Sequence, residues 1–289
     1  MTTVVAVIAP GAMGAAVGRR LADGGLKVLT SLEGRSPETV ARAKAARMVG
    51  ASDDEIAACD FILSILPPGD ALALAERFAP ALTRSNAKPV YVDCNAINPK
   101  TVERVAAAIA PSGAPFVDAG IIGPPPKPVV PGETASGTGT RFYASGPSAP
   151  RFASLRDYGL DVRVLDGPLS AASALKMSYA GITKGFTALG ATMMLAAARA
   201  GTTEALIAEM KVSQPALLKW LTTQMPKMHG KAYRWVAEIE EIAAFVGPGE
   251  TGDGFYQSAA ELYRRIAADF EGPGVETGAL DAFCDTATG

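Results

Sequence analysis

The sequence predicts an α/β protein, in which a doubly wound parallel sheet of the Rossmann type is followed by an all-helical domain. Through the first half, short β-rich runs alternate with helix-like segments. After Gly167 the character changes, because 169–200 contains no proline and few β-branched residues. We therefore expect a dinucleotide-binding domain at residues 1–167 and a helical domain for substrate binding and dimerisation at 168–289.

The predicted strands are continuous apolar runs, which is typical of strands that helices cover on both faces. They lie at residues 4–9, 27–32, 61–66, 89–94, 115–120, 141–146 and 162–167.

Residues 169–200 predict one helix roughly 45 Å long at 1.5 Å per residue. It is apolar around most of its circumference, so one neighbouring helix cannot cover it. We expect it to be buried in a helical domain shared by two subunits of a homodimer, with a monomeric bundle as the alternative. Its most apolar part, 186–198, is shorter than the roughly 18 to 20 residues that span a membrane, so no membrane partner is expected.

A proline- and glycine-rich segment, 123–139, separates two of the predicted strands. It cannot continue a sheet or a helix, so we expect an extended loop that serves either as a linker or as a pocket wall.

Composition excludes several classes of site. The net charge is −2 and the basic residues are scattered, which argues against a nucleic-acid partner. The three cysteines, Cys59, Cys94 and Cys284, form no C-x-x-C pair and fit a reducing cytoplasm. His229 is the only histidine, so no metal site is expected. The amino terminus reads as a first strand and not as a signal peptide.

The first strand leads into the turn 9–14, Ala-Pro-Gly-Ala-Met-Gly, and then into a helix-like segment. This strand–turn–helix context favours a dinucleotide site, in which Gly11, Ala12, Met13 and Gly14 contact the pyrophosphate. Ala9 stands at the position of the usual first glycine, where alanine is tolerated if φ is negative. The alternative is a small-residue turn without a nucleotide.

The second predicted strand ends at Glu33-Gly34-Arg35-Ser36, which contains both an acid for a ribose hydroxyl and a basic residue for a 2′-phosphate. Arg35 and Ser36 together would form a phosphate clamp. We therefore predict NADP as the cofactor, with NAD as the alternative.

Over nearly its whole length, the chain resembles the β-hydroxyacid dehydrogenases, which include 6-phosphogluconate dehydrogenase and the related imine reductases. The motifs that carry the resemblance are IAPGAMG (8–14), GRS (34–36), ILPPGDA (65–71), VDCNAINP (92–99), VDAGIIGPP (117–125) and ALKMSYAG (174–181). Residues 231–243, KAYRWVAEIEEIA, resemble a helical domain of unknown function found in a subset of these proteins. The resemblance implies further cofactor contacts from Leu66, Pro67 and Asn95.

The resemblance also implies that Lys176 is the general acid or base beside the nicotinamide. An ammonium in so apolar a segment must be paired or have a lowered pKa, which suits proton transfer near neutral pH. The alternative is that Lys176 and Lys184 both extend to solvent. Tyr179, three residues after Lys176, could relay the proton or merely pack.

Three positions depart from the family pattern. Ala180 replaces an asparagine, Ile122-Gly123-Pro124 replaces Ser-Gly-Gly, and Asn95 replaces a serine or threonine. We expect Ile122, Gly123 and Ala180 to contact the substrate, and because polar donors are lost there, we expect a different substrate from the family's small carboxylates.

In the helical domain, Lys231 and Arg234 are candidate anchors for a substrate anion, with Tyr233 and Trp235 as walls. The alternative is a solvated helix face on which Arg234 pairs with carboxylates four and seven residues further on.

The sequence thus predicts an NADP-dependent oxidoreductase that transfers a hydride between nicotinamide and a hydroxyl or carbonyl carbon of a small molecule, with Lys176 transferring the proton. The alternatives are an imine reductase and a nucleotide-binding protein without turnover.

Overall fold

The computed structural model describes residues 3–128 and 139–289. Its chain forms two compact units, Met1–Met177 and Ser178–Gly289. The boundary expected from sequence, between 167 and 168, lies slightly earlier, in the loop before the long helix. The division of labour between the two domains stays a prediction.

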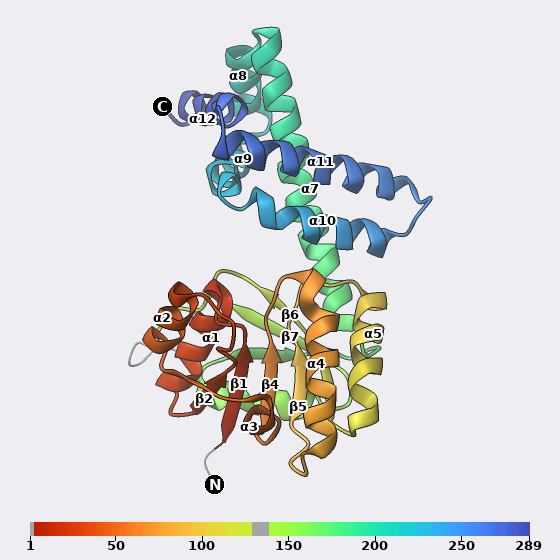
Figure 1. Ribbon diagram of the computed structural model, residues 1–289. Coiled ribbons are helices and arrows are strands. Elements are labelled where there is room, and N and C mark those ends of the chain that lie inside the picture. Colours follow the sequence, from red (N-terminus) through yellow and green to blue (C-terminus); the bar gives the residue numbers. More distant parts are fainter. Residues whose placement is uncertain (1–2, 129–138) are drawn as a thin grey trace. The chain divides into compact units, whose positions relative to one another are not determined.

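The first unit contains a mostly parallel sheet of eight strands in the order β3-β2-β1-β4-β5-β6-β7-β8 (Figure 1). The predicted Rossmann architecture is confirmed. The strands are β1 (Val4–Ile8), β2 (Lys27–Thr30), β3 (Met48–Gly50), β4 (Phe61–Ser64), β5 (Val90–Asp93), β6 (Phe116–Ile122), β7 (Arg141–Ser145) and β8 (Asp161–Val164).

Two features of the sheet differ from the prediction. Strand β3 was not expected, because an edge strand of three residues leaves no periodic signal. Strand β7 runs antiparallel to β6, whereas β8 is parallel to β7. The segment between β6 and β7 is rich in proline and glycine, and a parallel crossover would normally need a helix there.

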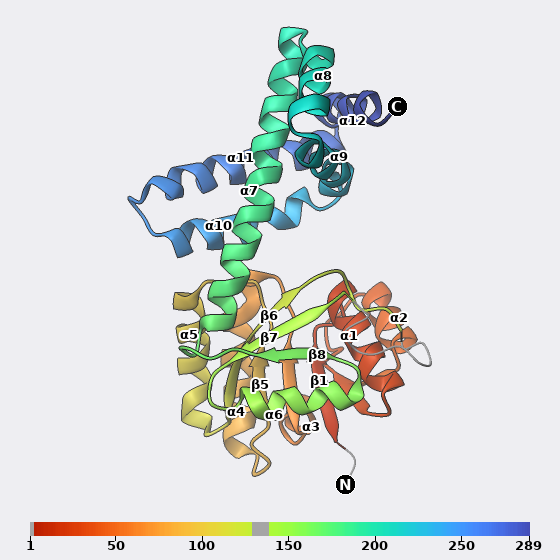
Figure 2. The ribbon, with the colours of Figure 1, turned by 180° about the vertical axis from the view of Figure 1, so that it is seen from behind.

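Alternate residues of each central strand pack on opposite faces of the sheet. In β1, Val5 and Val7 pack with α1 (Ala12–Asp23) and α2 (Pro37–Ala45), while Ala6 and Ile8 pack with helices of the other face. Figure 1 shows α4 and α5 in front of the sheet, and Figure 2, which is seen from behind, shows α6 on the opposite face. The remaining helices of the first unit are α3 (Asp53–Ala57), α4 (Ala71–Arg84), α5 (Pro99–Ile109) and α6 (Ala149–Phe152), with 3-10 turns η1 (Pro68–Asp70), η2 (Ala110–Ser112) and η4 (Ala153–Tyr158).

The predicted long helix is α7 (Ala171–Ala200), which begins in the first unit and continues into the second. The second unit is otherwise helical, and α10 and α11 lie side by side (Figures 1 and 2). Its further helices are α8 (Thr203–Ser213), α9 (Pro215–His229), α10 (Ala232–Val246), α11 (Thr251–Glu271) and α12 (Val275–Thr288). Within the described ranges, no helix is both long and apolar enough to cross a membrane.

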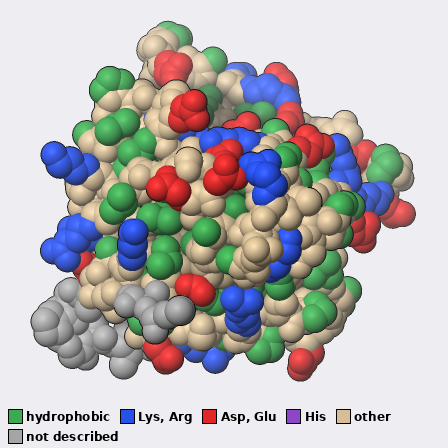
Figure 3. Space-filling view, turned by 60° about the horizontal axis from the view of Figure 1, so that its bottom comes forward, with side chains coloured by type: hydrophobic (Ala, Val, Ile, Leu, Met, Phe, Trp, Pro, Cys, Tyr) green, Lys and Arg blue, Asp and Glu red, His purple; other side chains and the backbone are tan. Residues whose placement is uncertain are grey.

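Charged side chains are distributed without segregation on the face drawn in Figure 3, where acidic and basic groups alternate. Together with a net charge of −2, this distribution gives that face no field of one sign that would steer a polyanion.

Candidate functional site

The candidate site begins where the winding of the sheet reverses. From β1 the chain continues to β2 and β3 on one side, and β4 then lies on the other side of β1. The two central strands are still joined just beyond their carboxyl ends, where the Ala9 amide donates to the Ile65 carbonyl at 3.2 Å. Doubly wound sheets bind their ligands at this reversal point.

The turn that follows β1 has the geometry of a phosphate-binding loop. Gly11 is the N-cap of α1, gives no side-chain cap, and is followed by no acidic residue in the first turn. A Cβ added to Gly11 would meet nothing within 4 Å, whereas one added to Gly14 would lie 2.0 Å from the Ala9 carbonyl oxygen. Gly14 therefore allows the close packing of helix and strand, and Gly11 leaves the helix start open to an anion.

Ala9 fits the turn without a left-handed conformation. Among the described residues, the non-glycine positions with positive φ are Arg47 and Lys88. Alanine at the first-glycine position is therefore compatible with the turn, and the residues present fit a dinucleotide.

Arg42 is a neighbour of this turn that the sequence prediction missed. Its guanidinium extends from α2 and donates to the Pro10 carbonyl at 3.2 Å. No local pattern links the two residues, because they are joined only when α2 packs beside the turn. Arg42 adds positive charge beside the open helix start.

Arg35 and Ser36 lie between β2 and α2. Ser36 is the N-cap of α2, and its hydroxyl accepts from the Thr39 amide at 3.4 Å. The side chains of Arg35 and Glu33 are exposed, and Gly34 takes the left-handed turn with φ 68°. The N-terminus of α2 and the Arg35 side chain are therefore both available to bind a phosphate, and Glu33 is available to bind a ribose hydroxyl.

Asn95 follows β5, is buried, and has all its amide groups engaged. Its Oδ1 accepts from the Leu66 amide at 2.6 Å, and its Nδ2 donates to Ser64 Oγ at 2.8 Å and to Asp93 Oδ2 at 3.1 Å. Asn95 thus fixes the loop that carries Leu66 and Pro67 after β4. Direct contact of these three residues with a cofactor stays a prediction.

A row of polar side chains crosses the sheet beneath this loop. Ser64, Asp93, Asp118 and Ser145 lie in register on β4, β5, β6 and β7, and each is fully buried. Burial raises the pKa of Asp93 to about 7 and that of Asp118 to about 6. We call these four residues the buried polar row. Sequence reasoning missed it, because register between strands is not a local signal.

Lys176 lies in the first turns of α7, half-buried, and its Nζ donates to the Ile121 carbonyl at 2.7 Å. The helix approaches β6 closely, since a Cβ added to Gly120 would lie 2.9 Å from the Ala172 carbonyl oxygen and 3.1 Å from Lys176 Cβ. The structure therefore brings Lys176 to the carboxyl end of β6, the edge of the sheet that carries the cofactor turn.

Ile122 is the last residue of β6, and Gly123 follows it at the same edge. Ile122 is buried, whereas Gly123 is exposed and has φ 123°. A Cβ on Gly123 would lie 2.1 Å from the Gly139 carbonyl oxygen, and Thr140 Oγ1 donates to the Pro124 carbonyl at 2.5 Å. These contacts join the two ends of the predicted loop 123–139, of which 129–138 fall outside the described residues.

Tyr179 and Ala180 continue α7 beyond the first unit. Ala180 is buried, while Tyr179 is 50% exposed. Tyr179 belongs to an apolar stripe of α7 with alternating spacings of four and three residues. The stripe consists of Leu175, Tyr179, Ile182, Phe186, Leu189 and Met193, all exposed.

Lys231 and Arg234 are exposed in the second unit, and the Arg234 guanidinium lies over the Tyr233 ring at 5.8 Å. Glu238, four residues after Arg234, pairs with Lys184. The described residues thus show Lys184 buried and paired, in contrast to the alternative in which it extends to solvent.

Trp235 packs against Lys184 and Tyr263. Its ring lies 5.4 Å from Lys184 Nζ and stands perpendicular to Tyr263 at 5.3 Å between centroids. Tyr263 donates from its hydroxyl to the Lys184 carbonyl at 2.6 Å. The role of Trp235 as a pocket wall stays a prediction.

The remaining reactive side chains do not join the site. His229 pairs with Asp281 at 2.9 Å in the second unit. Cys59, Cys94 and Cys284 are buried free thiols. Among the described residues, no group of His, Cys, Asp and Glu has a metal-binding arrangement.

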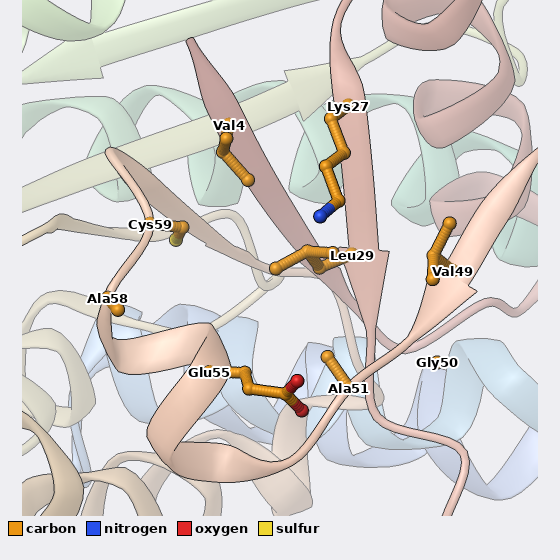
Figure 4. Close-up of a pocket in the computed structure, with 9 residues that line it drawn as sticks. All are labelled: Val4, Lys27, Leu29, Val49, Gly50, Ala51, Glu55, Ala58 and Cys59. Carbon is orange, nitrogen blue, oxygen red and sulfur yellow. The ribbon is translucent and has the colours of Figure 1, made fainter. Parts of the chain in front are cut away.

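A cavity of about 310 Å³ lies between β1–β3 and α3 (Figure 4). Its lining includes Val4 and Lys27, the first residues of β1 and β2, together with Glu55 and Cys59. Its lining contains none of the residues of the turn at 9–14 and none of α7.

Comparison of the sequence with protein families finds two matches. Residues 4–147 match the NAD binding domain of 6-phosphogluconate dehydrogenase, and residues 197–266 match a domain of unknown function, DUF1932. No curated protein matches the chain.

Solved structures of similar fold cover nearly the whole chain. A conserved protein of unknown function, described as structurally similar to 3-hydroxyacid dehydrogenases, is 27% identical with a TM-score of 0.67 over 93% of this chain and 98% of its own. A conserved hypothetical protein from Sinorhizobium meliloti is 21% identical with a TM-score of 0.70, over 98% and 97%. The 3-hydroxyisobutyrate dehydrogenase of Mycobacterium tuberculosis, solved with L-serine, is 17% identical with a TM-score of 0.69 over all of both chains.

Proposed function

Because the chain joins the NAD binding domain of 6-phosphogluconate dehydrogenase to a DUF1932 helical domain, we propose that it is an NADP-dependent oxidoreductase of the hydroxyacid dehydrogenase type. The observation that carries the proposal is that the open phosphate-binding turn and Lys176 lie at the same edge of the sheet. The nicotinamide, when bound, supplies the hydride chemistry.

The cofactor preference rests on the basic groups around the start of α2. Arg35 and the capped helix N-terminus at Ser36 suit a 2′-phosphate, and Arg42 adds charge between this helix and the turn at Pro10. Glu33 would favour the NAD alternative if it, and not Arg35, faced the ribose.

Lys176 is the proposed general acid or base. Its ammonium is held by the Ile121 carbonyl at the end of β6, where Ile122 and Gly123 form the expected substrate contacts. In the direction of carbonyl reduction, Lys176 gives a proton to the substrate oxygen, and in the reverse direction it removes one from the hydroxyl.

The substrate is proposed to be a small hydroxy or keto compound that carries more apolar surface than a simple hydroxy acid. The side chains of Ile122 and Ala180 contain no hydrogen-bond donor, so they cannot bind the carboxylate of a substrate. Lys231 and Arg234 remain candidate anchors for an anionic group, and Tyr179 remains a candidate proton relay.

The cofactor is tested by titrating NADPH and NADH against wild type and Arg35→Ala while nucleotide fluorescence is followed. We expect Arg35→Ala to weaken NADPH binding by about 10- to 100-fold and NADH binding little, since one charge-assisted contact is lost. Arg84→Ala, in an exposed ion pair on α4, is the control. Preference for NADH, unchanged by Arg35→Ala, would overturn the NADP assignment.

The reaction is tested with a panel of hydroxy acids, keto acids and cyclic imines. We expect Lys176→Ala and Lys176→Arg to lower kcat by about 10²- to 10⁴-fold while NADPH binding is kept, because an arginine keeps the charge but does not release its proton. Turnover that survives both substitutions would refute the role of Lys176. Tight NADPH binding without turnover across the panel would favour a non-catalytic protein.

We also propose a homodimer that forms through the apolar stripe of α7. The stripe has the four- and three-residue spacing by which one helix packs along another. Its side chains are exposed in the single chain. The buried free thiols suit a reducing compartment, which supports the cytoplasm as the location.

A further inference from the structure

Asp118 ties the beginning of α7 to the sheet. Its Oδ2 accepts from the Ser173 amide at 2.7 Å, and its Oδ1 accepts from the Ser173 hydroxyl at 2.6 Å. Ser145, its register partner on β7, reinforces this anchor: its hydroxyl accepts from the Ala172 amide at 2.9 Å and donates to the Leu169 carbonyl at 2.7 Å. All three anchoring side chains are fully buried.

Strand β6 and helix α7 make a second contact three residues further along each element. Three residues after Asp118 on β6 is Ile121, and three residues after Ser173 on α7 is Lys176, whose Nζ donates to the Ile121 carbonyl. Two contacts therefore link β6 and α7 in sequence, and the buried anchor comes first. Between them Gly120 admits the helix backbone, because a Cβ at this position would lie 2.9 Å from the Ala172 carbonyl oxygen.

We propose that Asp118 is a positioning residue for Lys176: by holding Ser173, it fixes the place of α7 on β6. The inference rests on the proposed function only for its catalytic consequence. Without the carboxylate, the amide and the hydroxyl of Ser173 in the first turn of α7 lose their acceptor, and the helix that carries Lys176 is held less firmly on β6.

The surroundings of Asp118 act on the pKa of its carboxyl group in opposite directions. Burial raises the pKa of Asp118 to about 6, while hydrogen bonds from Ser173 and Ser145 act in the opposite direction. The titratable groups near it are Asp93 on β5 and the buried Cys94 thiol, and burial together with the charge of Asp118 raises the pKa of both groups. The hydrogen bonds that Ser173 of α7 donates therefore favour the ionised carboxylate of Asp118 at this buried position.

The test measures the freedom of the Lys176 ammonium directly. Reductive methylation with ¹³C-formaldehyde, followed by peptide mapping, gives the labelling rate of each lysine in the full-length protein. We expect Asp118→Asn and Ser173→Ala to raise the labelling rate of Lys176 about tenfold, since local opening becomes easier when a helix cap is lost. The rate of Lys184, buried and paired with Glu238, should stay unchanged as an internal reference.

The chain offers a matched control in the second unit. Asp269 Oδ2 accepts from the Thr277 amide and hydroxyl at 2.8 and 2.9 Å, the same pair of bonds at the start of α12. Asp269→Asn should lower stability as a lost cap does, yet leave the labelling of Lys176 unchanged. Ser173→Thr, which keeps the hydroxyl, should restore slow labelling.

With a substrate from the panel, the positioning role predicts a fall in kcat of about tenfold in Ser173→Ala with an unchanged dissociation constant for NADPH, and a displaced pH profile of kcat. Lys176 labelling that is unchanged in both Asp118→Asn and Ser173→Ala, or equally raised by Asp269→Asn, would overturn the inference. An active Lys176→Ala enzyme would instead overturn the proposed function and leave the labelling result standing.

Discussion

Gly11 and Gly14 stand three residues apart in one turn, and the structure gives them different tasks. Gly14 is needed by the protein itself, because a Cβ there would collide with the Ala9 backbone. Gly11 has free space around it and is needed only if something else occupies that space. The two positions therefore separate folding from cofactor binding.

We predict that Gly14→Ala lowers the free energy of unfolding by roughly 1–3 kcal/mol, whereas Gly11→Ala leaves it within about 0.5 kcal/mol. Gly11→Ala should nevertheless weaken NADPH binding about tenfold or more, because its methyl group would face the pyrophosphate. Denaturant unfolding and nucleotide titration of both variants measure the two effects. Full NADPH affinity in Gly11→Ala would contradict the placement of the pyrophosphate.

Asp93 predicts how stability depends on pH. Its pKa in the folded protein is raised to about 7 by burial, so the native state keeps a proton that the unfolded state has lost above its own value near 4. The native state thus binds more protons between about pH 4 and pH 7, and the free energy of unfolding falls as the pH rises through this range.

We expect this contribution to be roughly 1–3 kcal/mol, and Asp93→Asn to remove most of it. Denaturant unfolding of wild type and Asp93→Asn at pH 5 and pH 8 gives the comparison. An equal change in both proteins would show that Asp93 is ionised throughout this range.

At the scale of elements, α7 is held differently in its two parts. In the first unit its start is anchored to β6 and β7 through Asp118 and Ser145. In the second unit Lys184 pairs with Glu238 of α10 inside a cluster that also contains Trp235 and Tyr263. A buried pair of this kind is costly to break from one side only.

Glu238→Gln should therefore destabilise the second unit by roughly 2–3 kcal/mol, because Lys184 would remain largely buried without its counter-ion. Asp54→Asn, which breaks the exposed pair with Arg84, should cost less than about 1 kcal/mol. Thermal unfolding of both variants makes the comparison. Equal costs would show that solvent reaches Lys184 in the folded protein.

The elements also show what the sequence could predict. The turn at 9–14 and helix α7 were predictable because strand, turn and helix signals lie within a few residues of each other. The pairing of Lys184 with Glu238 was not, because it joins residues 54 positions apart through the packing of α7 on α10. The contact between Arg42 and Pro10 likewise depends on where α2 packs, which local pattern does not specify. The antiparallel direction of β7 was not predictable for the same reason, since it is set by pairing with β6.

At the scale of the whole molecule, the proposed homodimer concerns the apolar stripe of α7. Ile182 is 62% exposed and Phe186 is 48% exposed, and a small apolar hollow beside them is lined by Gly181, Gly185 and Phe255. A contiguous exposed apolar surface of this kind marks an interaction site.

We predict that Ile182→Glu converts the dimer to a monomer at micromolar concentration, because a charge would be buried without a partner in the interface. Val212→Glu on α8 is the control, since Val212 is 84% exposed but lies outside the stripe. Light scattering coupled to size-exclusion chromatography gives the mass of each variant. A dimer that persists in Ile182→Glu would place the interface elsewhere.

The buried polar row has a further consequence, for how the chain finds this arrangement. Asp118 gains its hydrogen bonds from Ser145 and Ser173 only when β6 and β7 are aligned in the observed register and α7 has begun at the correct residue. A slip of one residue would turn each polar group to the opposite face, into an apolar core without donors. The row therefore penalises misaligned sheets, and folding fidelity and the placement of Lys176 depend on the same side chains.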